Sequence, residues 1–109
     1  MNYEVKSIAV FEKQAKRLIK KYASLKNELL ALIQVLKQDP QQGTSIGKNC
    51  FKIRIAISSK GRGKSGGARI ITNFVVEEST VFLISIYDKS EKENISDKEL
   101  NELLTYLPS

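Results

Sequence analysis

Seven basic side chains and no carboxylate occur between residues 48 and 69. They are Lys48, Lys52, Arg54, Lys60, Arg62, Lys64 and Arg69. The whole chain carries a net charge of only +6, so its positive charge is concentrated in this segment. Such a segment favours binding to nucleic acid, because phosphate contacts release counterions, or to an acidic protein that covers the same surface. Charge alone leaves both partners open.

The spacing of these cations predicts where they meet. Residues 51–57 and 68–76 have the β-branched, alternating pattern of strands, and the loop 58–67 between them is rich in glycine and lysine. Alternation places Lys52 and Arg54 together on the face opposite the core, while Arg69 begins the returning strand. The two strands and the loop therefore predict one phosphate-binding patch. The alternative is a hairpin connection whose lysines serve only solubility.

Composition excludes several chemistries. The chain has no histidine and a single cysteine, Cys50, which excludes an ordinary four-ligand zinc site, and we expect neither a metal nor a cofactor. Catalysis would fall to Lys, Arg, Tyr, Ser or carboxylates. The run Gly63-Lys64-Ser65 is not a nucleotide-binding loop, because Ser58 stands where that motif needs glycine and a strand follows instead of a helix.

The remaining pattern predicts one α+β domain over residues 1–109. A short strand near Tyr3 to Ser7 precedes two amphipathic helices, from Phe11 to Tyr22 and from Ser24 to Asp39. Three strands and a capped C-terminal helix from Ser96 follow. The expected order is β-α-α-β-β-β-α, with a helical hairpin packed on an antiparallel sheet. No segment has the length of a membrane span or the form of a secretory signal, so we expect a cytoplasmic protein.

Three segments of the chain resemble the RelE/ParE superfamily of bacterial toxins, and more closely the HigB-like branch of its RelE family. The segments are residues 50–55, 63–71 and 83–92. The most specific signal is Gly-Lys-x-Gly-Gly-x-Arg at 63–69, followed by Ile-Tyr-x-Lys-x-Glu-Lys at 86–92. The helical hairpin agrees with the family in pattern. The resemblance implies a RelE-like fold and the toxin of a type II toxin–antitoxin system.

The implied activity is a metal-independent endoribonuclease that cleaves messenger RNA on the ribosome and is neutralised by a cognate antitoxin protein. The positions that match the family's catalytic residues are Lys52, Arg54, Arg69 and Lys89. We expect the RNA to contact Lys48, Lys60, Arg62, Lys64, Tyr87 and Lys92 as well. Tyr87 has an equally weighted alternative, partial burial with its hydroxyl in water. Ile95 stands where some members have a tyrosine, so the resemblance does not identify the general base.

Two other functions share this fold or this patch. One is a ParE-like toxin that binds DNA gyrase and has no nuclease chemistry. The other is a module that binds RNA without cutting it. An antitoxin is expected to cover part of the cationic patch with an acidic segment, and the last helix, Ser96 to Leu107, is a candidate to be contacted or displaced.

Overall fold

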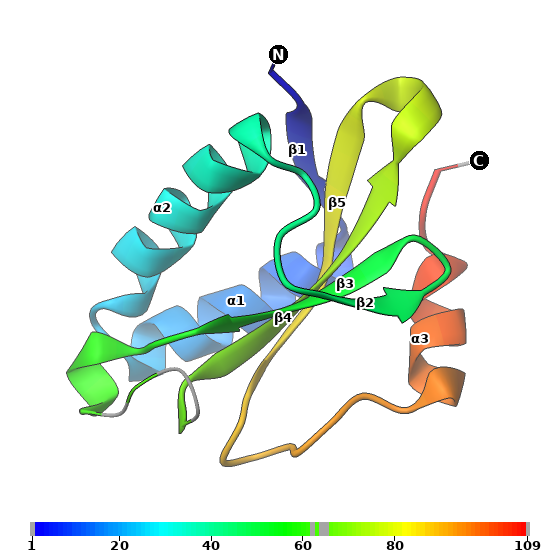
Figure 1. Ribbon diagram of the computed structural model, residues 1–109. Coiled ribbons are helices and arrows are strands. Elements are labelled where there is room, and N and C mark those ends of the chain that lie inside the picture. The colour runs from blue at the N-terminus through cyan, green and yellow to red at the C-terminus, as the bar shows by residue number, and fades with distance from the viewer. Residues whose placement is uncertain (1, 62, 64–65, 109) are drawn as a thin grey trace.

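The computed structural model describes residues 2–61, 63 and 66–108. It contains five strands and three α-helices in these residues (Figure 1). The strands are β1 (Glu4–Ser7), β2 (Thr44–Gly47), β3 (Cys50–Ile55), β4 (Ala68–Val75) and β5 (Thr80–Asp88). The helices are α1 (Ala9–Lys21), α2 (Leu25–Gln38) and α3 (Asp97–Leu104), with single 3-10 turns η1 (Ser58–Lys60) and η3 (Val76–Glu78). The predicted α+β class is confirmed.

The sheet has the order β1-β5-β4-β3-β2. Strands β2 to β5 are antiparallel neighbours, but β1 pairs in parallel with β5, so the sheet is mixed and not antiparallel throughout. Alternation in a short strand predicts its faces but not its partner or direction, which is why this pairing was missed. Strand β2 was not predicted, because its four residues include a glycine and adjoin a polar linker.

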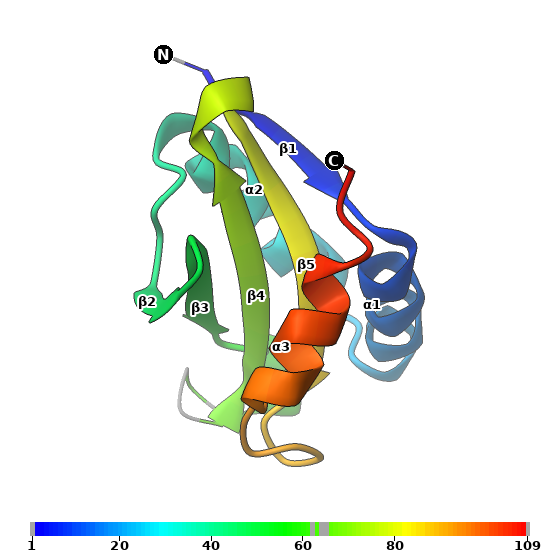
Figure 2. The same ribbon diagram turned by 90° about the vertical axis from the view of Figure 1, so that its right-hand side faces the viewer.

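The helices lie around the sheet on different sides. Figure 2 shows α2 behind the sheet, α3 in front of β4 and β5, and α1 beside β1 and β5. The core is continuous, and side chains from β4 and β5 are almost wholly inaccessible to solvent. Two long strands covered by helices thus form a rigid base for side chains at their ends. Among the described residues, no helix combines the length and the apolar composition of a membrane span.

The helix ends differ in how local sequence fixes them. The side chain of Ser96 accepts a hydrogen bond from the backbone N–H of Glu99, whose carboxylate accepts in turn from the backbone of Ser96, so the predicted capping box is confirmed. Ser24 precedes α2 as predicted but makes no capping bond. Its hydroxyl instead contacts Ser59 of η1, which ties the helical hairpin to the base of the glycine-rich loop.

The edge of β5 is closed by a side chain where β1 ends. Pairing between the two strands stops at Ser7, opposite Leu83. Farther along, Oε1 of Gln14 on α1 accepts a hydrogen bond from the backbone N–H of Ile86 at 3.0 Å and from the hydroxyl of Ser85. A side-chain amide therefore satisfies a strand donor that would otherwise be unpaired beside a helix.

Candidate nucleic-acid interface

Arg54, Arg69 and Tyr87 lie in one row across three neighbouring strands. The antiparallel register pairs Arg54 of β3 with Arg69 of β4, and Arg69 with Tyr87 of β5. Directly opposite residues in such a sheet present their side chains on the same face, with Cβ atoms about 5 Å apart. The structure thus brings two guanidinium-bearing residues and one phenol from distant parts of the sequence to one place.

The environment of Arg69 is unusual for an arginine. Only 4% of the residue is exposed, and a guanidinium N–H donates to the backbone carbonyl of Ala68 at 3.2 Å. Burial lowers the pKa of Arg69, and the positive charge of Arg54 lowers it further. A guanidinium remains charged despite such a shift, because its ordinary pKa lies so far above neutrality. The pair therefore holds two like charges together, an arrangement that an added anion would stabilise.

Two further predicted residues lie next to this row. Lys52 is two residues before Arg54 on β3, so it projects from the same face, and its ammonium group donates to the side-chain carbonyl of Asn94 at 3.3 Å. Lys89 follows β5, where its backbone N–H donates to the carbonyl of Gly67 at 3.0 Å. Its ammonium group donates to the backbone carbonyl of Glu93. Three of the four residues predicted to be catalytic, Lys52, Arg54 and Arg69, thus occupy neighbouring positions of β3 and β4, and Lys89 directly follows β5.

Gly67 is required for that arrangement. A Cβ at this position would lie 2.0 Å from the backbone oxygen of Ile55 at the end of β3. Any larger residue would therefore push β3 and the start of β4 apart. The glycine allows the strand ends that bear Arg54 and Arg69 to stay close.

Tyr87 is covered by the segment that leads into α3. It is 6% exposed, and its hydroxyl is buried and forms no hydrogen bond with any described residue. The alternative that placed this hydroxyl in water is therefore wrong. The ammonium group of Lys92 lies 5.4 Å from the ring centre and also pairs with the carboxylate of Glu99 on α3. Burial raises the pKa of Tyr87, so the phenol is protonated near neutrality.

Lys48 lies at the far end of the same face. It occupies a left-handed position, φ 57°, in the tight turn between β2 and β3. Its ammonium group donates to the side-chain carbonyl of Asn101 on α3. The turn is held by Asn73, whose amide donates to the backbone carbonyl of Lys48 at 3.1 Å. Lys48 therefore flanks α3, apart from the row of Arg54, Arg69 and Tyr87.

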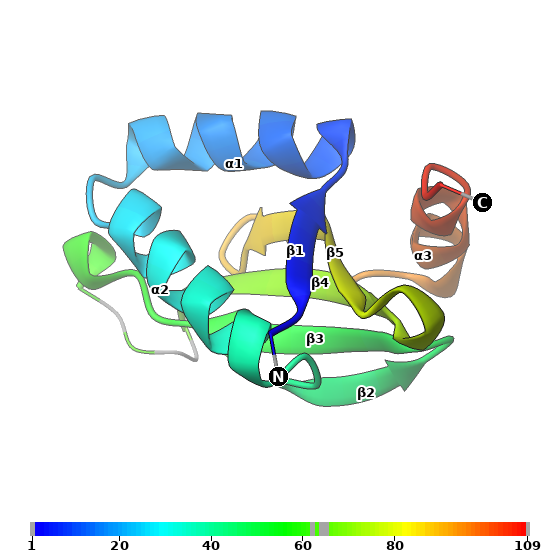
Figure 3. The same ribbon diagram turned by 90° about the horizontal axis from the view of Figure 1, so that it is seen from above.

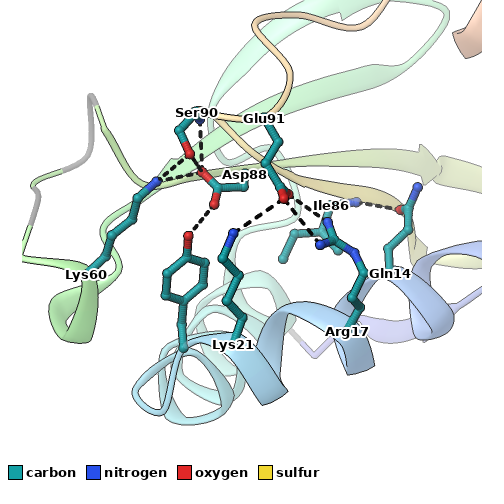
Figure 4. A network of polar contacts seen from close by, with 9 residues as sticks. Gln14, Arg17, Lys21, Lys60, Ile86, Asp88, Ser90 and Glu91 are labelled. Atoms are coloured by element: carbon teal, nitrogen blue, oxygen red, sulfur yellow. Dashed lines mark hydrogen bonds and ion pairs between the residues drawn. The ribbon is translucent and has the colours of Figure 1, made fainter.

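The structure does not bring Lys60 to this face. Its ammonium group lies 2.6 Å from a carboxylate oxygen of Asp88, which alternates with Tyr87 along β5 and so points to the opposite side of the sheet. Asp88 is fully buried and also accepts hydrogen bonds from the hydroxyl of Tyr22 at 2.5 Å and from Ser90 (Figure 4). The hydrogen bonds from Lys60, Tyr22 and Ser90 outweigh burial and hold the pKa of Asp88 well below its usual range. Lys60 is thus an internal partner of a carboxylate.

A second ion pair cluster adjoins Asp88. One carboxylate, Glu91, accepts from the guanidinium of Arg17 at 2.7 Å and lies 3.4 Å from the ammonium group of Lys21 (Figure 4). Two basic residues of α1 therefore share one carboxylate of the turn after β5.

Arg62 and Lys64, which were predicted to contact RNA, lie outside the described residues. Sequence reasoning missed Asp88 as the partner of Lys60, although an Asp followed two residues later by Ser at a strand end is typical of a side-chain turn. The contacts of Asn94 and Asn101 with lysines depend on tertiary structure and leave no local signal. Among the described residues, no group of three His, Cys, Asp or Glu side chains is placed to hold a metal ion.

This geometry is suited to an anionic backbone. Two fixed guanidinium groups and nearby ammonium groups can stabilise extra negative charge on a phosphate during displacement, and a preorganised donor is typically worth about 3 kcal/mol in such a site. The ring of Tyr87 at the end of the row is of a kind on which a base can stack, but here Lys92 lies over it.

Comparisons with known proteins identify the family of the chain and related folds. The model of a family described as the RelE toxin of the RelE/RelB toxin–antitoxin system matches residues 8–107. A mutant of the E. coli toxin RelE in the free state superposes with a TM-score of 0.61 at 18% sequence identity, covering 99% of this chain and 100% of that one. The toxin–antitoxin complex RelBE2 from Mycobacterium tuberculosis gives a TM-score of 0.58 at 15% identity, with 81% and 92% covered. These structures establish the similarity of fold.

The intact E. coli RelBE toxin–antitoxin complex provides a third comparison. Its matching chain has a TM-score of 0.62 and 19% identity, and the match covers 79% of this chain and 95% of that chain. The likeness extends over nearly the whole of each solved structure.

Proposed function

Because the chain belongs to the RelE toxin family, and is therefore a RelE-type toxin of a toxin–antitoxin system, we propose that it is a ribosome-dependent endoribonuclease that cleaves messenger RNA. The observation that carries this proposal is the row of Arg54, Arg69 and Tyr87 across β3, β4 and β5. The motifs at 63–69 and 86–92 further support a place in the HigB-like branch. The span of the family match, 8–107, supports one toxin domain over residues 1–109.

The proposed reaction is attack of a ribose 2′-hydroxyl on the adjacent phosphorus. The new P–O bond forms as the bond to the 5′-oxygen breaks, which leaves a 2′,3′-cyclic phosphate and a 5′-hydroxyl. Arg54 and Arg69 stabilise the charge that develops on the phosphorane oxygens. Lys52 and Lys89 are the candidates for transfer of protons to and from the reacting oxygens.

Access to Tyr87 depends on the segment before α3. Since Lys92 lies over the ring and is paired with Glu99, a base can stack on Tyr87 only after Lys92 has moved. The ribosome or the messenger would have to supply the contacts that replace this pair. Lys48 and Lys92 then bind RNA on either side of the reacting phosphate, whereas Lys60 keeps the structural role that its contact with Asp88 gives it.

The partners of this activity are the ribosome, its bound messenger and an antitoxin, which implies a cytoplasmic site of action. The solved relatives include complexes of a toxin with its antitoxin. We propose that a cognate antitoxin binds this chain as well. An acidic segment that covers the arginine pair would compete directly with the RNA backbone.

The test is inducible expression of the chain with mapping of the 5′ ends of cellular messages, repeated with Arg69→Ala. We expect cleavage within translated messages by the wild-type chain and a loss of about 100-fold or more with Arg69→Ala, since a preorganised donor to the reacting phosphate is removed. Arg17→Ala is the matched control, because this exposed arginine is paired with Glu91 away from the row.

Each other result has a clear meaning. Full cleavage by Arg69→Ala would refute the role of Arg69. Intact messages together with arrested DNA replication would favour the gyrase-binding alternative. Salt-sensitive RNA binding without cleavage would indicate the non-catalytic module.

A further inference from the structure

The turn that follows β5 carries Lys89, and its backbone is fixed by the last residue of that strand. The backbone carbonyl of Asp88 accepts hydrogen bonds from the backbone N–H groups of Glu91 and Lys92, each at 3.0 Å. The backbone N–H of Lys89 donates to the carbonyl of Gly67 at 3.0 Å and continues the contact between the ends of β4 and β5. The path of this turn therefore depends on where Asp88 lies.

The side chain of Asp88 anchors the turn on the opposite side of the sheet. Its Oδ1 atom accepts from the ammonium group of Lys60 at 2.6 Å and from the backbone N–H and the hydroxyl of Ser90 at 2.9 and 2.7 Å (Figure 4). Its Oδ2 atom accepts from the hydroxyl of Tyr22, which follows α1, at 2.5 Å. Because Asp88 is fully buried, water does not compete for these hydrogen bonds. The end of β5 is thus joined to η1 and to the end of α1.

The two donors from outside the turn are held by the helical hairpin. Figure 3 shows η1, which ends at Lys60, next to the connection between α1 and α2. The carboxylate of Glu28 on α2 accepts from the backbone N–H and from the hydroxyl of Ser58, both at 2.8 Å. The ammonium group of Lys60 also lies 5.5 Å from the centre of the Tyr22 ring. The side chains that bind Asp88 therefore belong to a frame built from both helices and η1.

Asp88 lies between two predicted site residues, Tyr87 and Lys89. Its own side chain points to the other side of the sheet, so it cannot touch RNA bound at the arginine pair. It can, however, restrain the backbone from which Lys89 extends. A buried ion pair often stabilises a fold no better than apolar side chains of the same volume, so stability alone does not account for this network.

We propose that Asp88, held by Tyr22 and Lys60, is a positioning residue that fixes the turn bearing Lys89 beside the reacting phosphate. The inference rests on the proposed nuclease function, in which Lys89 is a candidate for proton transfer. Displacement of a reacting group by about 1 Å can cost about 100-fold in rate, so contacts on the far side of the sheet can control the reaction. The arginine pair stands on the ladder between β3 and β4, which does not include Asp88.

The test uses Tyr22→Phe in the full chain. This change removes one hydroxyl and keeps the ring, whereas Asp88→Asn also deprives Lys60 of its counter-charge. Tyr3→Phe is the matched control, because Tyr3 is half-buried like Tyr22 and packs its ring against Phe74, away from the turn. Circular dichroism selects a temperature at which wild type and both variants are fully folded.

Cleavage of a defined message on purified ribosomes gives kcat and KM for each protein. We expect Tyr22→Phe to lower kcat about 10-fold and to leave KM within about 2-fold of wild type, because the reacting group is misplaced while RNA binding is retained. Tyr3→Phe should match wild type in both constants. Equal kcat values for Tyr22→Phe and wild type, or a change confined to KM, would overturn the proposal.

NMR of the same proteins without ribosomes tests the position of the turn directly. Residual dipolar couplings report the direction of each backbone N–H bond in the folded chain, and a loss of stability alone does not change them. We expect Tyr22→Phe to alter the couplings of Lys89 and Lys92 and to leave those of β3 and β4 unchanged. A lower kcat with couplings identical to those of wild type would show that Tyr22 does not act through position, and would also overturn the proposal.

Failure of the positioning role differs from failure of the nuclease. Messages left intact by the wild-type chain would reject the proposed nuclease. Active wild type together with fully active Tyr22→Phe would reject only the role of Asp88 and its partners.

Discussion

At the end of β5, the basic residues on the two faces of the sheet have different kinds of contact partner. On the side of α1 and α2, Lys60 is paired with the buried carboxylate of Asp88, while the neighbouring Glu91 pairs with two cations of α1. On the other side, Arg54 and Arg69 are direct neighbours. The lysines on that face contact amide oxygens of Asn94 and Asn101, which carry no charge. The pair of Lys92 and Glu99 is the exception, and it lies over Tyr87.

This difference separates structural cations from functional ones better than sequence does. A cation that is matched to a carboxylate contributes to folding and has little left to offer a ligand. A cation held beside another cation costs folding free energy, which binding of an anion recovers. Lys60 and Arg69 look equivalent in the sequence, yet Lys60 lies beside a buried carboxylate and Arg69 lies opposite another arginine.

The largest expected effect is on the structural side. Asp88→Asn should lower the free energy of unfolding by about 3 kcal/mol, because it leaves the ammonium group of Lys60 nearly buried without a counter-charge. Urea unfolding followed by circular dichroism measures this change. Glu91→Gln is the matched control in the same turn, and its effect should stay below about 1 kcal/mol because its ion pairs are exposed. Equal losses of unfolding free energy in Asp88→Asn and Glu91→Gln would contradict the distinction between the buried and the exposed ion pairs.

The pH dependence of stability provides a second test of the role of Asp88. Folding lowers the pKa of Asp88, so the stabilisation from its ionised form is complete above the ordinary Asp pKa of about 3.9 and is lost as the pH falls toward the folded value. The stability difference between wild type and Asp88→Asn should thus be constant from pH 7 to about pH 5 and shrink below about pH 4. Urea unfolding at a series of pH values tests this. A difference that grew on acidification would contradict it.

The smallest expected change in stability is on the other face. Arg69→Met should change the free energy of unfolding by less than about 1 kcal/mol, because loss of the guanidinium's contacts is offset by relief of its burial and of its repulsion by Arg54. Thermal unfolding measures this, with Ile71→Val on the same strand as a control for general sensitivity of β4. A loss as large as that of Asp88→Asn would mean that Arg69 is a structural cation.

The fold was largely predictable because helix and strand patterns are local. The helical stripes, the capping box at Ser96 and the three long strands all follow from spacing within one element. The parallel pairing of β1 with β5 was not predictable, since it joins strands far apart in the sequence through a register that no local signal specifies. Strand β2 was missed for a similar reason, as its few residues become a strand only through pairing with β3.

The sequence predicted which basic residues share a face of the sheet, but it did not predict which residues they contact. Alternation placed Lys52 and Arg54 on one face correctly, and the return of β4 brought Arg69 beside them. Lys60 belongs to the same basic run, but the 3-10 turn at Ser58–Lys60 directs it to Asp88 on the other side. A count of charges cannot distinguish these cases, because the distinction lies in which carboxylate the fold brings near.

The glutamine on α1 that accepts from the N–H of Ile86 has a consequence for self-association. Exposed strand edges are templates on which a strand of another molecule can add. The stretch of β5 beyond the end of β1 would be such a template, and Gln14 occupies its hydrogen-bonding position with a side chain that cannot be extended into a new strand. A strand from another copy of the chain could pair with this part of β5 only if the hydrogen bond between Gln14 and Ile86 were broken first. One side-chain amide therefore opposes aggregation through this strand edge.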